Sequence, residues 1–338
     1  MSIPELDAGA MAAARAELDR KTKPRGSLGR LEELAVQLAG IHGLVEPRFA
    51  VVVAAADHGY AEEGVSAYPA EVTRQMLSNF AAGGAAVSVL ARVFEAELVV
   101  VDAGVREALG DPVVRSVRIG AGTANATRGP AMSRDQAQAS LEAGRELAGE
   151  LEGVTAVALG EMGIANTTAA AALHAALLGV PAAKVCGPGT GLDARGVRHK
   201  AEVVERALAA NAPLGADAVD VLAALGGFEI GLLAGLALGA AERRAAVVLD
   251  GFIVGAAALV AARIEPRVVD YMIAAHLSPE LGHRLGLEAL GLRPLLDLEL
   301  RLGEGSGAVL ALPLLRAALA ILEEMASFEA AGVTDAGR

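Results

Sequence analysis

The glutamate at position 304 lies in a segment whose composition suits chemistry better than scaffolding. Residues 301–307 read Arg-Leu-Gly-Glu-Gly-Ser-Gly, so Glu304 stands between two glycines and a third follows closely. Glycine gives the backbone freedom at the cost of chain entropy, which is useful where a loop must approach a ligand. A carboxylate in such a loop is a candidate general base. A tight turn with an exposed glutamate would give the same pattern.

Two further glycine-rich turns are candidate phosphate sites. GEMGIANTT begins at Gly160 and CGPGTGLD begins at Cys186, and each joins an apolar run to a helical pattern. The free N–H groups and positive dipole end of a helix N-terminus bind anions, although helix capping alone gives similar sequences. The turn that begins at Cys186 has the spacing of neither a dinucleotide fingerprint nor a P-loop. Lys200, about two helical turns after Asp193, could add a positive charge, or could simply lie on a solvated helix face.

Two other segments are more ambiguous. Asp57 and His58 follow a strand-like run, where such a pair can act in acid/base or metal chemistry. Alternatively, Asp57 caps a turn and His58 is packed or exposed. The segment from Lys23 to Arg30 reads as a structural loop before a helix.

These turns need a rigid scaffold, and the hydrophobic pattern predicts one. Short apolar runs alternate with helical patterns, which indicates a three-layer α/β/α fold with a mainly parallel, Rossmann-like sheet and right-handed crossovers. Ligands of such sheets bind beyond the carboxyl ends of the strands. The predicted strands are Phe49–Ala55, Ala96–Asp102, Val154–Leu159, Ala182–Val185, Ala245–Leu249 and Val268–Ile273, and the predicted helices are Pro69–Leu90, Ser133–Glu150, Asn166–Leu178, Asp193–Ala210, Gly227–Gly239 and Phe252–Ala262.

The two ends of the chain differ from its middle because they read as helical throughout. We expect residues 1–43 and 305–338 to form a small helical domain together, beside a large α/β domain of residues 44–304 that carries the active site. The abundance of Ala, Val, Leu and Gly, with 3% aromatic residues and no Trp, predicts closely packed helices and strands of small residues.

Composition also excludes several classes of function. A net charge of −12 argues against a nucleic-acid surface, which needs a basic face. The single Cys186 excludes an internal disulfide, and without a Cys/His cluster a structural zinc site is not expected. The N-terminus shows no leader, and charged residues interrupt the apolar stretch from Gly231 to Ala262. We therefore expect a soluble, cytoplasmic protein with no membrane span.

Taken in order, the motifs resemble one enzyme family, the nicotinate-nucleotide–dimethylbenzimidazole phosphoribosyltransferases of cobalamin nucleotide-loop assembly. The resemblance is collinear from about residue 20 to about residue 320. Two positions depart from it: Arg25 stands where the family usually has Pro, and Ala165 where it usually has Gly. The motifs are KPRGSLGRLEELA, AADHGYAEEGVSAYPAEVTRQM, GTANATRGPAM, LGEMGIANTTAAAAL, CGPGTGLD, GGFEIGLLAGLALGAA, VVLDGFIVGAAALVA, HLSPELGH and LDLELRLGEGSGA.

The resemblance implies a reaction and a set of site residues. 5,6-Dimethylbenzimidazole attacks C1′ of nicotinate mononucleotide, nicotinate leaves, and α-ribazole 5′-phosphate forms with inversion. It further implies a homodimer, no metal or organic cofactor, and Glu304 as the catalytic base. Glu161 is our candidate to stabilise charge at C1′ or to hold ribose hydroxyls. The expected substrate-binding residues are Ser66, Gln75, Met76, Leu302, Gly163, Asn166, Thr167, Thr168, Gly189, Thr190, Gly191 and Lys200.

Two alternatives make different demands on the sequence. A phosphoribosyltransferase that uses a pyrophosphate donor would need a strand that ends in two acids before a Thr/Gly loop, and the nearest match here reads as helix. A nucleotide-binding or regulatory module on the same fold would keep the phosphate turns but would have no need of Glu304.

Overall fold

The core of the protein is one six-stranded sheet in which every pair of neighbouring strands is parallel. The computed structural model describes residues 2–189, 191–212 and 217–334. The strand order is β3-β2-β1-β4-β5-β6, and the chain changes direction across the sheet between β1 and β4. The strands are β1 Phe49–Ala56, β2 Glu97–Gly104, β3 Val114–Ser116, β4 Ala156–Met162, β5 Ala246–Leu249 and β6 Met272–Ala274.

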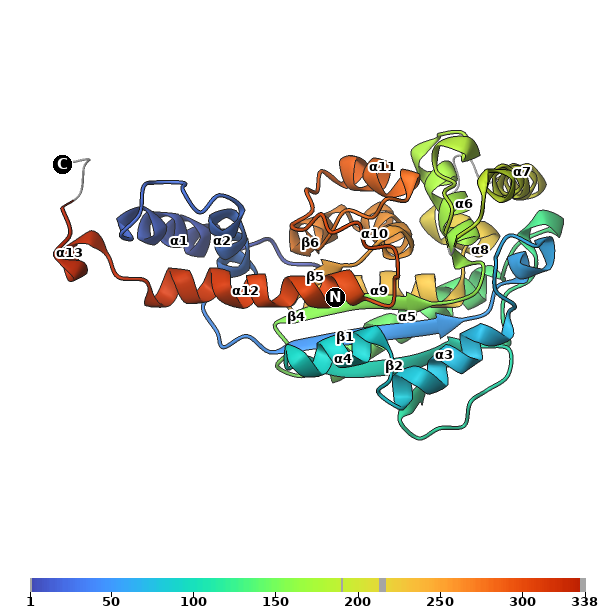
Figure 1. Ribbon diagram of the computed structural model, residues 1–338, viewed down its shortest axis with the longest axis horizontal. Coiled ribbons are helices and arrows are strands. Elements are labelled where there is room, and N and C mark those ends of the chain that lie inside the picture. Colours follow the sequence, from blue (N-terminus) through green and yellow to red (C-terminus); the bar gives the residue numbers. More distant parts are fainter. Residues whose placement is uncertain (1, 190, 213–216, 335–338) are drawn as a thin grey trace.

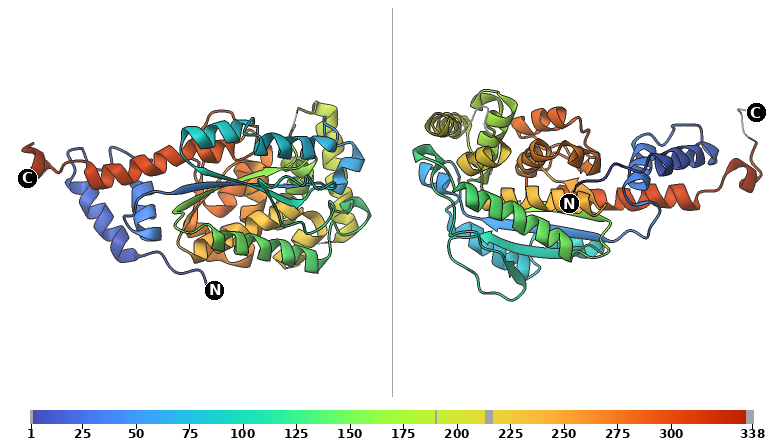
Figure 2. Two further views of the ribbon diagram at one scale, coloured as in Figure 1. Left: turned by 90° about the horizontal axis from the view of Figure 1, so that it is seen from below. Right: turned by 180° about the vertical axis from the view of Figure 1, so that it is seen from behind.

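Helices cover both faces of this sheet, which confirms the expected three-layer α/β fold (Figures 1 and 2). Helices α3, α4 and α12 pack on one face, and α5, α9 and α10 form the layer on the other. Helices α6, α7, α8 and α11 pack outside α10 and beyond the carboxyl ends of the strands. The bounds are α3 Glu71–Ala81, α4 Ala86–Val93, α5 Arg134–Glu150, α6 Asn166–Leu178, α7 Ala194–Asn211, α8 Ala218–Leu225, α9 Phe228–Glu242, α10 Phe252–Ile264, α11 Leu281–Leu290 and α12 Ser306–Glu324.

Small residues let α5 and α9 touch backbone to backbone. A Cβ atom at Gly235 would lie 1.9 Å from the carbonyl oxygen of Leu141, and one at Gly144 would lie 2.0 Å from that of Leu232. Real Cβ atoms do not approach that closely, so only glycine fits at these two positions. The expectation of close packing by small residues is confirmed for this helix pair.

One predicted strand is wrong and another is only partly correct. Ala182–Val185 begins directly after a proline and forms a 3₁₀ helix, Ala182–Lys184, instead of pairing with the sheet. Most of Val268–Ile273 also lies in a 3₁₀ helix, Pro266–Tyr271, because Pro266 favours a helical start. Only the short β6 that follows joins the sheet.

One predicted helix is divided in two. Pro69–Leu90 was expected to be continuous, but the chain breaks at Gly83 and Gly84 between α3 and α4. Gly83 has a φ of +76°, a left-handed conformation that a continuing α-helix does not contain. The break creates a second helix N-terminus, at α4. The sequence reading also missed β3, α8 and α11.

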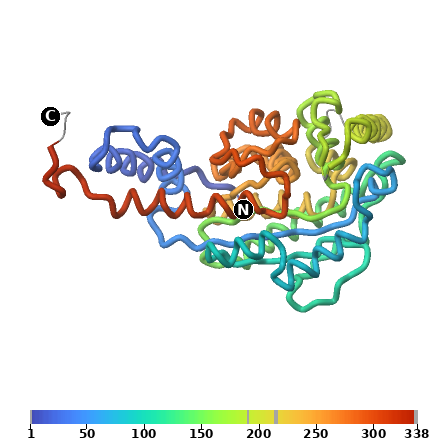
Figure 3. Tube along the Cα trace, viewed as in Figure 1, coloured from blue at the N-terminus to red at the C-terminus, as the bar shows by residue number. Residues whose placement is uncertain are grey.

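The N-terminal helices α1 (Ala8–Arg20) and α2 (Arg30–His42) lie beside the far end of α12, and the short α13 (Phe328–Ala331) follows it (Figure 3). The first turns of α12 pack instead against β4, β5 and α4. Helix α12 thus connects the sheet with the terminal helices. The division into a small helical domain and a large α/β domain stays a prediction.

Two segments, Glu71–Val93 and Ser306–Glu324, are long and apolar enough to cross a membrane by length and composition alone. Core helices of soluble proteins pass the same test. Ser306–Glu324 is α12, which packs on the sheet, and Glu71–Val93 contains the break between α3 and α4. The expectation of no membrane span stays a prediction.

Candidate active site

Glu304 lies in the turn that leads from the loop after α11 into α12. Gly303, Glu304 and Gly305 have φ values of +83°, +65° and +85°, so three successive residues are left-handed. The two glycines adopt this conformation without penalty, whereas for Glu304 it costs about 1–2 kcal/mol. A strained non-glycine residue of this kind is typical of functional positions.

The carboxyl group of Glu304 is buried, with 7% of the residue exposed. Burial is the main cause that raises its pKa to about 7, and the negative charge of Asp250 adds to the shift. The backbone N–H of Val87, in the first turn of α4, opposes it. Its Oε2 atom has no hydrogen-bond partner among the described residues. Glu304 therefore carries a carboxyl group with a pKa near neutral pH and with one buried oxygen that is left unpaired.

Glu161 is the second buried acid, near the carboxyl end of β4. Its pKa is raised to about 8, chiefly by burial and also by the charges of Asp250, Glu229 and Glu304. A hydrogen bond from Asn166 Nδ2 to its Oε2 opposes the shift. A Cβ atom at Gly303 would lie 2.5 Å from Glu161 Oε1. The turn that carries Glu304 therefore rests directly on the Glu161 side chain.

The two glutamates share a cleft beyond the carboxyl ends of β4, β5 and β6, with a cavity volume of about 90 Å³. In residues 2–189, 191–212 and 217–334 no group of His, Cys, Asp and Glu side chains could hold a metal ion. Of the expected site residues, the cleft is lined by Glu161, Gly163, Asn166, Thr167, Gly189, Leu302 and Glu304.

Lys200 lies on α7, is only 1% exposed, and does not itself line the cleft. Its Nζ donates to Thr167 Oγ1 and to the carbonyl of Gly187, both at 3.1 Å. A Cβ atom at Gly189 would lie 2.9 Å from the same nitrogen. Burial lowers the lysine pKa, and the charge of Glu280 opposes that shift. The solvated alternative for Lys200 is therefore wrong.

The remaining members of the expected phosphate turns are placed as follows. Ala165 has a φ of +74°, so it holds a left-handed position that glycine would occupy without strain. Thr168 is fully buried. Gly191 is also left-handed, with a φ of +114°. Thr190 lies outside the described residues.

Cys186 opens the second glycine-rich turn and is 1% exposed. Burial raises its pKa to about 12, with the charge of Lys200 opposing the shift. The thiol is therefore protonated and unreactive at neutral pH.

The sequence analysis missed three polar residues that line the cleft, His276, Ser278 and Glu280. It also missed Asp250, which neighbours His276. Asp250 lies directly after β5 and contacts the start of α12. Glu280 Oε1 accepts a hydrogen bond of 2.7 Å from the N–H of Gly189, and its Oε2 has no partner among the described residues. Asp250 follows a predicted strand, so the rule that led to Glu161 could also have found it.

Asp57 and His58 make different contacts and have different structural roles. Asp57 Oδ2 accepts a 2.7 Å hydrogen bond from the N–H of Arg106 and so ties two loops together. His58 Nε2 lies 2.6 Å from Glu229 Oε1, with both side chains fully buried. A Cβ atom at Gly163 would lie 3.1 Å from the His58 ring, so the His58–Glu229 pair packs against the turn that follows Glu161.

Six of the described residues that were expected to bind substrate do not line the cleft: Ser66, Gln75, Met76, Thr168, Gly191 and Lys200. Gln75 is exposed and Met76 is partly buried against the core. The helix of Gln75 and Met76 does contact the site, because Thr73 Oγ1 accepts a 3.0 Å hydrogen bond from the N–H of Ile164. A role for them in binding stays a prediction.

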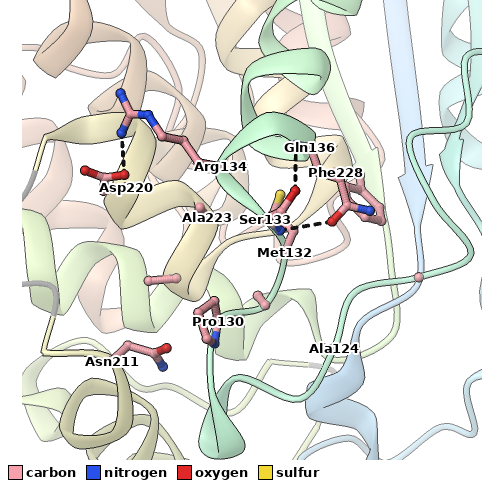
Figure 4. A pocket seen from close by; sticks show the side chains of 13 residues that line it. Ala124, Pro130, Met132, Ser133, Arg134, Gln136, Asn211, Asp220, Ala223 and Phe228 are labelled. Carbon is pink, nitrogen blue, oxygen red and sulfur yellow. Dashed lines mark hydrogen bonds and ion pairs between the residues drawn. The ribbon is translucent and has the colours of Figure 1, made fainter.

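A wider hollow lies between the N-terminal end of α5 and α8 (Figure 4). Arg134 points across it toward Asp220 and pairs with that residue and with Asp217. The hollow contains none of the expected site residues. Since its charged groups are already paired with one another, the cleft with Glu161 and Glu304 is the better candidate for chemistry.

Comparisons with known proteins support the fold and the class of reaction. A family model described as phosphoribosyltransferase matches residues 3–333. The chain is 54% identical to nicotinate-nucleotide–dimethylbenzimidazole phosphoribosyltransferase of Chloroflexus aggregans, over 98% of this chain and 96% of that protein. The protein of the same name from Pseudomonas putida strain F1 is also 54% identical, with the same coverage.

Solved structures give the same result. The crystal structure of nicotinate-nucleotide–dimethylbenzimidazole phosphoribosyltransferase from Thermus thermophilus is similar, with a TM-score of 0.92 at 50% identity. The match covers 98% of this chain and all of that one. A crystal structure of CobT from the same organism has a TM-score of 0.93 at 52% identity and covers 96% of this chain and 99% of that one.

Proposed function

We propose, from the premise that this chain belongs to the nicotinate-nucleotide–dimethylbenzimidazole phosphoribosyltransferase family, how its cleft carries out the family's reaction. The chain transfers the 5-phosphoribosyl group of nicotinate mononucleotide to 5,6-dimethylbenzimidazole. The products are nicotinate and α-ribazole 5′-phosphate, a step in cobalamin biosynthesis. The observation that carries the assignment of roles is the buried Glu304 carboxyl, whose pKa lies near neutral pH and whose residue lines the cleft together with Glu161.

Glu304 is the general base. Nicotinate leaves from a pyridinium, which already carries positive charge, so its departure needs no general acid. One nitrogen of the benzimidazole attacks C1′ while the other holds a proton that becomes acidic as the bond forms. A base works best when its pKa lies near the working pH, and Glu304 meets this condition with a pKa of about 7.

Glu161 stabilises the positive charge that develops at C1′ in an oxocarbenium-like transition state. In the free protein its pKa of about 8 keeps the carboxyl group largely protonated at pH 7. A bound pyridinium nucleotide brings a positive charge that favours ionisation. The alternative role, holding the ribose hydroxyls, uses the same position.

The phosphate of the nucleotide binds between the start of α6 and the second glycine-rich turn. Lys200 supplies the positive charge, and Gly163, Asn166, Thr167, Thr168, Gly189, Thr190 and Gly191 supply amides and hydroxyls. This assignment is supported by the hydrogen bond between Lys200 and Thr167, which brings the two turns together. Lys200 could instead face the nicotinate carboxylate.

The benzimidazole ring occupies an apolar slot beside Glu304. Leu302 lines the cleft next to the base although it is 58% exposed without a ligand. Ser66, Gln75 and Met76 form the opposite wall if α3 closes over the ring. Entry from the face opposite nicotinate gives inversion at C1′.

The wider context completes the proposal. The enzyme is a soluble, cytoplasmic homodimer that binds neither nucleic acid nor membrane and needs no metal or organic cofactor. Sedimentation of the purified protein tests the dimer, and turnover after exhaustive treatment with a chelator tests the independence from metals.

Glu304→Gln tests the assignment because it keeps the shape of the side chain and removes its basicity. Turnover of nicotinate mononucleotide and dimethylbenzimidazole should fall by about 10²–10⁴-fold, while calorimetry shows that nicotinate mononucleotide still binds. Near-normal turnover in Glu304→Gln would contradict the role of base. If the wild-type protein binds the nucleotide but gives no product, the non-enzymatic alternative is correct.

A further inference from the structure

Asp250 caps a helix to which it does not belong. It follows β5, is 1% exposed, and directs its carboxylate at the start of α12. Its Oδ2 accepts from the N–H of Gly305 at 3.2 Å, and its Oδ1 accepts from the N–H of Ala308 at 3.0 Å. The N-cap residue of α12 is Gly305, which has no side chain to satisfy these amides. Asp250 therefore replaces the missing cap from another part of the chain.

His276 supports Asp250 from the other side. Its Nε2 lies 3.5 Å from Asp250 Oδ1. A Cβ atom at Gly307 would lie 2.1 Å from His276 Cδ2, so the imidazole packs directly against the first turn of α12. The His276 ring and the Asp250 carboxylate together fix where α12 begins.

Glu304 immediately precedes the start of α12, and its backbone has little conformational freedom. A Cβ atom at Gly160 would lie 2.4 Å from the carbonyl oxygen of Glu304, so the turn is pressed against β4. The left-handed conformation of Glu304 needs contacts of this kind to persist. The two amide bonds to Asp250 are the polar part of that restraint.

We propose that Asp250 is a positioning residue for the catalytic base: it holds the turn that carries Glu304 through two backbone amides and places a negative charge behind the Glu304 carboxyl group. This inference rests on the proposed role of Glu304. Asp250 itself transfers no proton.

The charges around Glu304 support the second part of this proposal. Asp250, from the turn after β5, and the Val87 amide, from α4, act directly on Glu304. The titratable groups that line the cleft with it are Glu161, His276, Glu280 and Arg301. Of the charged side chains, Asp250 is the one whose negative charge acts on both glutamates and raises the pKa of each. Removal of that charge should return the Glu304 pKa from about 7 toward its ordinary value of 4.5.

The test compares Asp250→Asn with Asp250→Glu in the full-length protein. Asparagine removes the charge and offers only one acceptor oxygen, so the rise of kcat/KM with pH should shift to lower pH and kcat should fall by about 10–100-fold. Glutamate keeps the negative charge, but its longer side chain displaces the carboxylate. For Asp250→Glu, kcat should fall while the rise of kcat/KM stays near its parental pH. Thermal unfolding and circular dichroism establish that each variant is folded.

Asp217→Ala is the matched control. Asp217 also accepts two backbone amides, those of Val219 and Asp220, at the start of α8, remote from the cleft. Its removal should lower the stability but leave the pH profile and kcat unchanged. An unshifted profile in Asp250→Asn would overturn the electrostatic part of the proposal. A parental kcat in Asp250→Glu would overturn the positioning part, even if Asp250→Asn does not fold.

A direct titration separates this inference from the proposed function. The ¹³C resonance of the Glu304 carboxyl, identified by its absence in Glu304→Gln, can be followed against pH without substrate. Its midpoint should be lower in Asp250→Asn than in the parent, and an equal midpoint contradicts the inference. This readout stands even if Glu304→Gln proves active, which would overturn only the role of Glu304 as base.

Discussion

The backbone of Gly303 lies against the carboxylate of Glu161, where a Cβ atom would come within 2.5 Å of Oε1. The reverse contact is equally close, because a Cβ atom at Gly160 would lie 2.4 Å from the carbonyl oxygen of Glu304. Each acid therefore lies against a glycine that neighbours the other acid in sequence. The two turns form one unit, so a disturbance of either should displace both carboxylates.

Gly303→Ala should be far more damaging than its size suggests. The new methyl group would collide with Glu161 at a position where φ is also unfavourable, and kcat/KM should fall by about 100-fold. Gly43→Ala is the control, because Gly43 has a similar φ of +72° and open space around it. Steady-state kinetics and thermal unfolding of both variants give the comparison. A similar loss of activity in Gly43→Ala would contradict the contact-based explanation.

Glu304→Gly should abolish turnover and stabilise the fold. Glycine adopts a φ of +65° without strain, so unfolding in urea should require about 1 kcal/mol more than in Glu304→Ala. Both variants lose the carboxyl group, so their difference isolates the backbone strain. If the alanine variant is as stable as the glycine variant, the turn does not store the expected strain.

The fold should lose stability as the pH rises from about 5 to about 8. Glu161 and Glu304 have pKa values of about 8 and about 7 in the folded protein, above the ordinary 4.5. In this window the unfolded chain has released protons that the folded chain still holds, so unfolding becomes easier as pH rises. Glu161→Gln should therefore gain stability over the parent as pH increases, measured by urea unfolding at each pH. An effect that does not vary with pH would show that Glu161 has an ordinary pKa.

Lys200→Met should weaken binding of nicotinate mononucleotide by about 10–100-fold, the usual cost of a hydrogen bond to a charged group. The substitution also leaves the buried Glu280 without a neighbouring positive charge. Lys200→Met combined with Glu280→Gln removes that complication. If calorimetry of the double variant shows restored affinity, Lys200 only balances Glu280 and does not bind the substrate.

Ala165→Gly should raise the free energy of unfolding by about 1 kcal/mol, because Ala165 holds a left-handed position at the start of α6. Ala212→Gly is the control, since Ala212 is left-handed at the end of α7, outside the cleft. Both variants should gain similar stability in urea unfolding. A loss of stability in Ala165→Gly would mean that its methyl group contributes more by packing than the strain costs.

Much of the fold could be predicted from the sequence because long periodic segments follow from hydrophobic burial. Strand β1 and helix α6 fall almost where the apolar runs place them. Short elements did not, because a run of four residues such as Ala182–Val185 carries no information about whether a partner strand is within reach. The Gly83–Gly84 break was missed for a related reason: it lets the start of α4 contact Glu304, which lies far away along the chain.

The candidate site residues also divide into those with a local signal in the sequence and those without one. Glu161 and Glu304 could be identified because several glycines lie close to each of them, which is a local signal. The His58–Glu229 pair spans 171 residues, so only the folded chain shows it. Asp250 is followed by a single glycine and Glu280 by a leucine, and neither sequence gave a local sign of the contacts with the Glu304 and Lys200 turns.

The burial of Cys186 has a practical consequence. It is the only cysteine in the chain, and its thiol is both shielded and protonated at neutral pH. A cysteine introduced at an exposed position such as Leu302 would then be the one thiol that a maleimide dye or spin label reaches in the native protein. Fluorescence or paramagnetic spectroscopy of a single label on the rim of the cleft could therefore follow loop movement in real time, with no need for a cysteine-free background.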